Sequence, residues 1–206
     1  MNTKSDREDA LTLEILDAVE RKSDVSQRHL ARHLGVALGL ANSYLKRCVR
    51  KGLIKIIDAP ANRYLYYLTP KGFTEKSRLT AQYFKSSLAF YRRAGESCDR
   101  VFADCLARDW RRLLLCGMSD LAEIATLRAM DKELTVIGFL DPRQAGRRVL
   151  GRPVWGALEA AEAHDACVLT DLEGPQALYE QLVITVPPEK VMVPDILRVE
   201  QSAAAR

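Results

Sequence analysis

Residues 26–72 read SQRHLARHLGVALGLANSYLKRCVRKGLIKIIDAPANRYLYYLTPKG. Ser26 stands where a helix N-cap belongs, ahead of a helical pattern over 27–34, and Gly35 supplies the left-handed conformation that commonly ends a helix. A second helical pattern covers 37–51 and stops at another glycine. Two helices joined through a short glycine turn predict a helix-turn-helix, whose second helix enters the major groove of DNA.

The residues on either side of this motif extend it to a winged helix. Leucine, isoleucine and valine at helical spacing predict a first helix over 8–22. Residues 53–57 and 63–68 are rich in β-branched and aromatic side chains, and the turn-forming residues 58–62 separate them. Because a hairpin directly after a recognition helix is a wing, we predict an α+β winged-helix domain over residues 1–94.

Charge is divided unevenly along the chain. Residues 1–95 hold 18 Lys/Arg against 9 Asp/Glu, a net charge of +9, whereas residues 96–206 hold 13 against 18, a net charge of −5. Between Arg21 and Arg93 the imbalance is 16 basic against 3 acidic residues. A cationic half beside an anionic half indicates a polyanionic partner for the first half only, and double-stranded DNA is the partner that fits the motif. RNA binding or protein docking by this half is an alternative.

Polar side chains on the exposed side of the helix over 37–51 are candidates for reading bases. Asparagine and arginine are the residue types that bind adenine and guanine edges bidentately. The candidates are Asn42, Ser43, Lys46, Arg47 and Arg50. Further cations suit phosphate contacts, which position a protein without reading sequence: Arg28, Arg32, Lys51, Lys55, Arg63 and Lys71. The helix begins with Ala37, Leu38 and Gly39, where base-reading side chains often lie, so the sequence indicates only modest readout.

The stretch SQRHLARHLGV…LANSYLKRCVRKGLIK…RYLYYLTPKGFTEKSRLT resembles winged-helix regulators of the MarR type, especially the subgroup associated with bacterial exopolysaccharide gene clusters. The resemblance covers residues 8–93, and the LTPKG ending of the second wing strand is part of it. It implies a transcription regulator, with polysaccharide genes as its targets.

A long helix is predicted over 73–93, with an aromatic-rich face that exceeds what a small winged domain needs. Helix-turn-helix proteins commonly pair to match two half-sites, so we expect this helix to mediate a homodimer. Residues 93–97 read RAGES and indicate a domain boundary, with a separate helix over 97–108. The second domain is therefore predicted over 95–206.

The second domain alternates apolar strands with helices. Buried strands are predicted at 113–116, 134–140 and 167–170, a closing strand at 191–193, and a hairpin-like piece at 150–156. Helices are predicted at 121–130, 157–163 and 174–182. Continuous apolar strands spaced by helices are typical of an α/β, Rossmann-like fold with a parallel, doubly wound sheet.

A turn in this domain is placed where such folds bind ligands. Gly117-x-Ser119-x-x-Ala122 follows the first strand and approximates the dinucleotide fingerprint G-x-G-x-x-G/A, although Ser119 replaces the second glycine. Asp141 closes the second strand near the place of a ribose-binding acid. The candidate ligand-binding residues are Gly117, Met118, Ser119, Asp120 and Asp141.

The stretch RLLLCGMSDLAEIA…LTVIGFLDPRQAGRRVLGRPVWG is similar to Rossmann-like domains of polysaccharide-biosynthesis proteins, including sugar acyltransferases and nucleotide-sugar dehydratases. The resemblance covers 111–195 and implies a nucleotide or nucleotide-sugar effector. The order of domains also resembles that of the bacterial redox-sensing repressor. Two alternatives stay open: a degenerate domain kept only for dimerisation, and an enzyme that uses NAD or a nucleotide-sugar.

Other classes of site find little support. We expect no catalytic residues, because His164 is the only histidine of the second half and has no paired base or nucleophile nearby. His29 and His33 share a helix face without further ligands, so no metal site is expected, and no cofactor is assigned. The scattered cysteines form no C-x-x-C pair and nothing indicates a lowered thiol pKa, which leaves a redox switch as a minor alternative. Without an apolar span or a secretory signal, we expect a cytoplasmic protein with no membrane partner.

Overall fold

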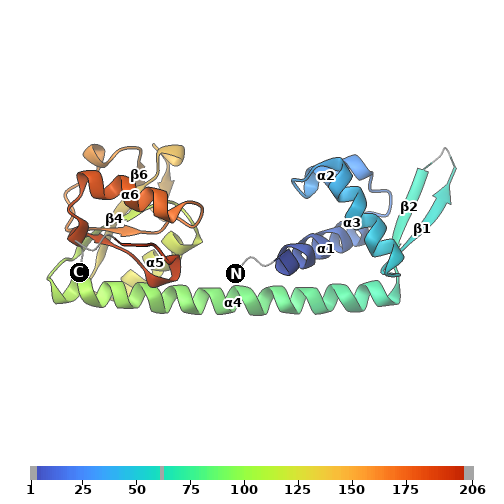
Figure 1. The fold of residues 1–206 in the computed structure, drawn as a ribbon, viewed down its shortest axis with the longest axis horizontal. Helices are drawn as coiled ribbons and strands as arrows, with labels where there is room; N and C mark the ends of the chain where they lie inside the picture. Colours follow the sequence, from blue (N-terminus) through green and yellow to red (C-terminus); the bar gives the residue numbers. More distant parts are fainter. Residues whose placement is uncertain (1–3, 61–62, 202–206) are drawn as a thin grey trace. The chain divides into compact units, whose positions relative to one another are not determined.

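The computed structural model describes residues 4–60 and 63–201. The chain divides into two compact units at Leu88 and Ala89. Helix α4, Pro70–Ala107, passes through this division and contributes its first half to one unit and its second half to the other (Figure 1). None of the helices in the described ranges is long and apolar enough to cross a membrane.

The first unit contains three helices, a hairpin and the start of α4. The elements before α4 are α1 (Lys4–Arg21), α2 (Gln27–His33), α3 (Leu38–Arg50), β1 (Ile54–Ala59) and β2 (Arg63–Leu68). The Ser26 side chain accepts a hydrogen bond from the backbone N–H of His29 and so caps α2, as predicted. Gly35 and Gly52 have positive φ angles of 61° and 70°, which turn the chain after α2 and α3.

The core of the first unit gathers apolar side chains from every one of its elements. Ile15 and Leu16 of α1, Leu30 of α2 and Leu45 of α3 are buried against Tyr66 of the wing. The antiparallel strands β1 and β2 pair in the register Ile54↔Leu68 to Ala59↔Arg63. The hairpin therefore stands directly after α3, which is the winged arrangement that the sequence predicts.

The closing motif of the wing is held by a close backbone approach. The N–H of Thr69 donates to the carbonyl of Leu53 at 3.0 Å. Gly72, in the first turn of α4, packs against that same carbonyl. A Cβ atom added at Gly72 would lie 2.1 Å from the Leu53 oxygen. Glycine at this position therefore lets α4 begin against β1.

The prediction of two helices separated at residues 93–97 is wrong, because α4 is continuous there. Gly95 packs closely against the side chain of Arg128, which lies 2.9 Å from where its Cβ would be. Phe102 and the neighbouring apolar residues of this half are fully buried in the second unit. A single helical glycine costs only about 1 kcal/mol relative to alanine, so this burial outweighs it.

The second unit is built on a six-stranded sheet in the order β5-β6-β4-β3-β7-β8. All neighbouring pairs are parallel except β5 and β6. The strands are β3 (Arg112–Cys116), β4 (Thr135–Leu140), β5 (Arg148–Val149), β6 (Arg152–Trp155), β7 (Ala166–Leu169) and β8 (Val191–Met192). The five parallel strands follow the doubly wound order 3-2-1-4-5, which confirms the predicted fold class.

Helices cover both faces of this sheet (Figure 1). The second half of α4 and helix α5 (Asp120–Met130) pack on one face, where Phe102 and Leu121 meet Leu113 and Leu115 of β3. Helix α6 (Pro175–Thr185) packs on the other face, where Tyr179 meets Leu114. Alternate residues of β3 thus enter opposite cores. Short 3-10 turns occur at Pro142–Gln144, Leu158–Ala160, Pro188–Lys190 and Asp195–Leu197.

Two details near β6 differ from the prediction. The helix expected over 157–163 is only the 3-10 turn at Leu158–Ala160, because Leu158 is the one large apolar side chain of this stretch and its alanines bury little surface. The expected hairpin exists, but its strand β6 also joins β4 in the sheet. Gly138 makes room for this pairing, since a Cβ there would lie 2.4 Å from the Trp155 ring.

Candidate nucleic-acid interface

A groove of about 680 Å³ lies between α3 and the wing. A second hollow of about 500 Å³ adjoins it and is lined by Ser43, Arg47, Arg50 and Lys51. The two hollows bring together six of the residues predicted from sequence to contact DNA. The groove between α3 and the wing, called the α3–wing groove below, is lined by Gln27, Asn42, Ser43, Leu45, Lys46, Val49, Arg50, Ile56, Tyr64 and Tyr66.

Helix α3 turns one face inward and leaves its polar face open. Ala41, Leu45 and Cys48 are buried at a spacing of four and three residues, so Ser43, Lys46 and Arg50 are exposed. Leu40 is 41% exposed, whereas Ala41, the next residue, is buried. A shift of one residue rotates a helical side chain by roughly 100°, which accounts for the difference.

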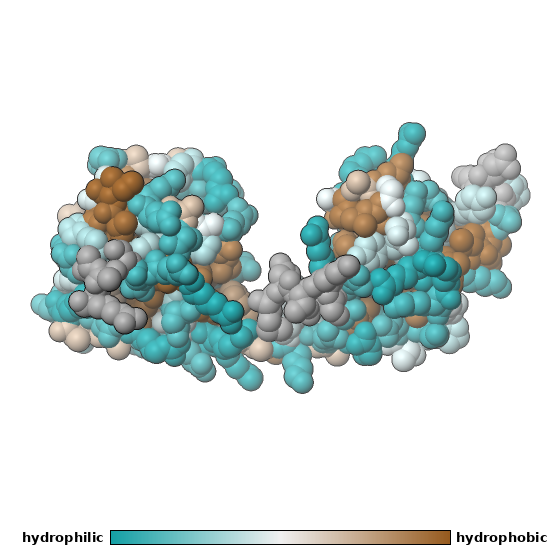
Figure 2. All heavy atoms as spheres, in the orientation of Figure 1, coloured by the Kyte–Doolittle hydropathy of each residue, from teal (hydrophilic) through white to brown (hydrophobic). Residues whose placement is uncertain are grey.

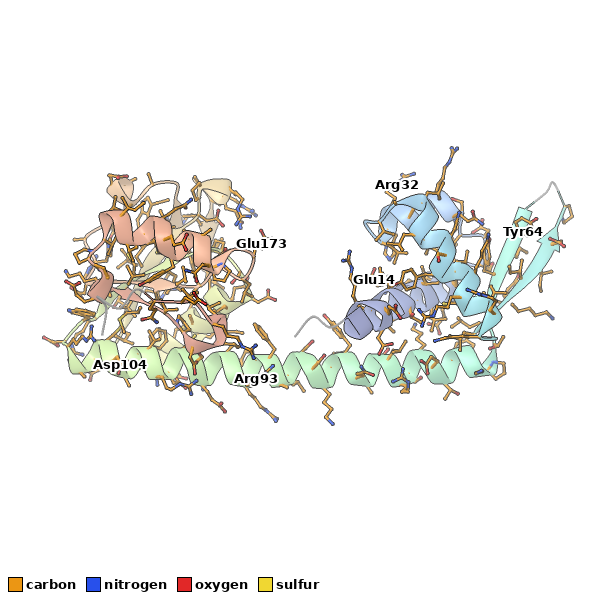
Figure 3. The ribbon with its side chains drawn as sticks, in the orientation of Figure 1. Glu14, Arg32, Tyr64, Arg93, Asp104 and Glu173 are labelled. Carbon is orange, nitrogen blue, oxygen red and sulfur yellow. The ribbon has the colours of Figure 1, made fainter. Side chains whose placement is uncertain are left out.

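The other residues predicted to contact DNA differ in their exposure and in their hydrogen-bond partners. Arg28 and Arg32 are exposed on α2, and Figure 3 marks Arg32 there. Lys71 donates its Nζ proton to the carbonyl of Lys51 at 2.9 Å, next to the end of α3. Arg47 donates to the carboxylate of Glu8 in α1 at 2.8 Å, so part of its guanidinium holds α3 to α1. The side chain of Arg63 lies outside the described residues.

Acidic side chains of the first unit are largely engaged away from the α3–wing groove. Asp17 and Glu20 of α1 both contact Lys76 of α4, and the hydrogen bond from Lys76 lowers the pKa of Asp17. Within the described ranges no acidic partner contacts Lys46 or Arg50. Among the described residues, Lys46 and Arg50 therefore have no acidic partner to give up when an external anion binds.

Sequence reasoning missed the apolar side of the α3–wing groove. Tyr64 is 57% exposed on β2, where Figure 3 marks it, and Ile56 on β1 is also exposed. Figure 2 shows hydrophobic residues gathered on this hairpin. Ile56 pairs directly with Tyr66, two residues from Tyr64, so strand alternation places all three on the side facing α3. That alternation is the signal from which the apolar lining could have been found.

The candidate ligand site of the second unit lies at the carboxyl ends of β3 and β4. Gly117 has a φ of 97°, and a Cβ there would lie 2.5 Å from the Cβ of Asp171. Ser119 caps α5 by accepting the N–H of Leu121 at 3.1 Å, and its hydroxyl donates to the carbonyl of Thr170. The helix N-terminus, where a phosphate would bind, is thus capped by the chain itself.

Asp141 is 3% exposed and accepts the backbone N–H groups of Met118 at 3.3 Å and Arg143 at 2.9 Å. The structure therefore brings four of the predicted ligand residues together, and the fifth, Asp120, is exposed in the first turn of α5.

Two further carboxylates that the sequence did not single out lie at this edge. The guanidinium of Arg143 contacts Glu173 at 2.6 Å and lies 3.6 Å from Asp141 and 3.8 Å from the buried Asp171. A carboxylate-rich edge opposes a pyrophosphate more than it attracts one. Arg143 is the cation here that partly offsets this repulsion.

All five cysteines are free and buried. Burial raises the pKa of Cys48 and Cys105 to about 11 and that of Cys98 to about 12. Cys167 differs, because hydrogen bonding with the Cys116 thiol, together with His164 at 3.5 Å, lowers its pKa to about 7. Sequence spacing offers no signal for the lowered pKa of this thiol, since the three residues meet only after β3 and β7 pair. No group of three or more metal-ligating side chains occurs in the described part of the chain.

A family model described as winged helix-turn-helix DNA-binding matches residues 8–55. The first unit therefore has a winged helix-turn-helix fold, and residues 8–55 of it are similar to a DNA-binding family. The matched stretch begins inside α1 and ends inside β1, so it covers most of α1, all of α2 and α3, and the beginning of the wing.

Among solved structures, the PcaV transcriptional regulator from Streptomyces coelicolor is 22% identical over 48% of this chain and 74% of its own, with a TM-score of 0.39. A MarR family protein of Mycobacterium tuberculosis, in complex with p-aminosalicylic acid, is 19% identical over 48% and 75%, with a TM-score of 0.37. PigF with SAH is 15% identical over 92% and 56%, with a TM-score of 0.25. A comparison with curated proteins gives no match.

Proposed function

We propose that this protein is a transcription regulator that binds operator DNA as a homodimer through α3 and the wing. The observation that carries the proposal is the pair of unneutralised cations, Lys46 and Arg50, beside the α3–wing groove. A helix that presents such cations next to a wing fits the major groove and the phosphates that flank it.

An apolar stripe on α4 supports the homodimer. Phe84, Leu88 and Tyr91 are 61%, 55% and 45% exposed and follow one another at a spacing of four and three residues. That spacing places them on one side of the helix, as in the seam between paired helices. A second copy of α4 would cover side chains that water otherwise surrounds, and it would supply the second DNA-binding domain for a two-fold operator.

Salt dependence tests the DNA-binding part of the proposal. Duplex DNA of mixed sequence is titrated with the protein at several salt concentrations, with single-stranded RNA of equal length in parallel. Counterion release predicts that log K falls with log [salt] with a slope steeper than about −4 for duplex DNA. Two chains are expected per duplex. A flat salt dependence, or tighter binding to the RNA, would contradict the proposal.

The second unit is proposed to sense a nucleotide or nucleotide-sugar and thereby to control polysaccharide genes. The doubly wound strand order supports this, because ligands of such sheets bind at the switch point, which here lies between β3 and β7. A catalytic role is not proposed, since His164 is engaged with the Glu162 carbonyl and Cys167. The side chains of Ser119 and Asp141 already accept hydrogen bonds from backbone N–H groups of this chain. That favours one alternative, in which the domain serves only as a scaffold for dimerisation.

Thermal unfolding in the presence of UDP-sugars, ATP and NAD distinguishes sensor from scaffold. A sensor is stabilised by its ligand, so the Tm of the wild type should rise by at least about 3 °C. Asp141→Ala should abolish that rise. This substitution also removes two hydrogen bonds from backbone N–H groups, so it needs a matched control. Asp165→Ala serves as that control, because Asp165 accepts the N–H groups of Arg111 and Arg112 at the amino end of β3, away from the candidate site. An unchanged rise in Asp141→Ala, or no rise with any compound, counts against sensing at this site.

A further inference from the structure

Resting on the proposed function, we propose that the α3–wing groove selects A·T base pairs. In this assignment the Asn42 amide binds adenine, and the apolar side formed by Ile56 and Tyr64 receives a thymine methyl group. The proposal names the base pair that the DNA-binding surface prefers.

Asn42 is distinguished by an unsatisfied polar atom. Its Oδ1 is buried and has no hydrogen-bond partner, and among the described residues of the first unit it is the only buried side-chain nitrogen or oxygen in that state. The side chain also lines the α3–wing groove, beside Ser43 and Lys46. Buried polar groups normally have partners, so this one is poised to gain a donor when the groove fills. In this proposal the amide rotates about its Cβ–Cγ bond when DNA binds, so that Oδ1 faces the groove.

The chemistry of the amide favours adenine among the four bases. An amide offers one acceptor oxygen and a donor NH2 side by side. In the major groove adenine presents the complementary pair, a donor at N6 and an acceptor at N7, whereas guanine presents two acceptors. A guanine opposite Asn42 would leave the unsatisfied oxygen without a donor.

The remaining lining of the groove fits the partner base. Ile56 and Tyr64 are both more than two-fifths exposed, although large apolar side chains are usually covered. Thymine is the base that carries a methyl group into the major groove. Lys46 and Arg50 border the same groove and suit the neighbouring phosphates. The apolar side therefore has a natural occupant in an A·T-rich site.

Selection from a random duplex library tests the assignment. The library spans about 20 base pairs, enough for two half-sites one helical turn apart. The wild type should enrich A·T at one position in each half-site, with a preference over G·C of about 10-fold. Asn42→Ala should reduce that preference to within about two-fold while it retains most non-specific binding. Gln181→Ala, which removes an exposed amide from helix α6 of the second unit, should leave the preference intact.

A second arm addresses the methyl group. Replacing the selected thymine with deoxyuridine removes only the 5-methyl group and should weaken binding by about three-fold. Unchanged enrichment in Asn42→Ala, enrichment of G·C, or equal binding of the deoxyuridine duplex would overturn the inference. Salt-sensitive binding without any base preference would overturn it while leaving the proposed function in place; failure to bind duplex DNA at all would remove both.

Discussion

Reversing two charges on α3, in the double variant Lys46→Glu with Arg50→Glu, should lower the affinity for duplex DNA at least about 100-fold in about 0.1 M salt. Both side chains border the α3–wing groove and neither has an acidic partner in the described structure. The substitution therefore removes two cations and adds two anions where phosphate approaches. Fluorescence anisotropy of a labelled duplex measures the loss, and circular dichroism confirms that the helices are retained.

The matched control carries the same change in net charge on the other unit. Arg147→Glu with Arg148→Glu alters two exposed arginines at the start of β5. If the contact is local to α3, this control should lose less than about three-fold in affinity, because charges beyond a Debye length of about 10 Å are largely screened. Equal losses in the two double variants would show that net charge, and not the α3 surface, drives binding.

Gly72→Ala should destabilise the first unit by about 3 kcal/mol or more, because overpacking at an unyielding contact costs that much. The added methyl group would lie 2.1 Å from the carbonyl oxygen of Leu53, and a backbone oxygen cannot rotate away as a side chain could. Either α4 or β1 must move, and the wing moves with them. Urea unfolding followed by circular dichroism measures the change in the free energy of unfolding.

The chain offers a convenient control and a way to assign the transition. Gly39→Ala makes the same substitution in α3, where nothing lies within 4 Å of the new methyl group, so it should be neutral or slightly stabilising. Both tryptophans, Trp110 and Trp155, belong to the second unit, so a loss seen by circular dichroism but not by tryptophan fluorescence is located in the first. A Gly72→Ala protein as stable as Gly39→Ala would mean that the contact with Leu53 is not tight.

The elements of the first unit were predictable because their signals are local. Ser26 caps the start of α2, and Gly35 and Gly52 turn the chain directly after α2 and α3, so each signal lies next to the helix end that it determines. The continuity of α4 was not predictable in this way. The glycine at 95 reads as a break in the sequence, and only the packing of Arg128 and Phe102, which come together from separate elements, overrides it.

For the candidate sites too, local patterns predict which residues are present, but not their long-range contacts. The cations of α3 follow from helical periodicity, whereas the pairing of Arg47 with Glu8 joins residues 39 positions apart and leaves no trace in the pattern. Asp141 was correctly placed at the end of β4, but its backbone partners at Met118 and Arg143 could not be inferred from spacing alone. Residue types predict which groups are available; the tertiary fold determines which of them are already engaged.

The strand order of the second unit has a consequence for how the chain is made. β3 is the first strand of its sheet to leave the ribosome, yet it lies in the middle, between β4 and β7. β4 follows after a single helix, while β7 begins only at Ala166, so one edge of β3 lacks its neighbour until then. An uncovered apolar strand edge is a template for pairing with other chains. Nascent chains that stall before residue 166 are therefore the form of this protein that most needs chaperone protection.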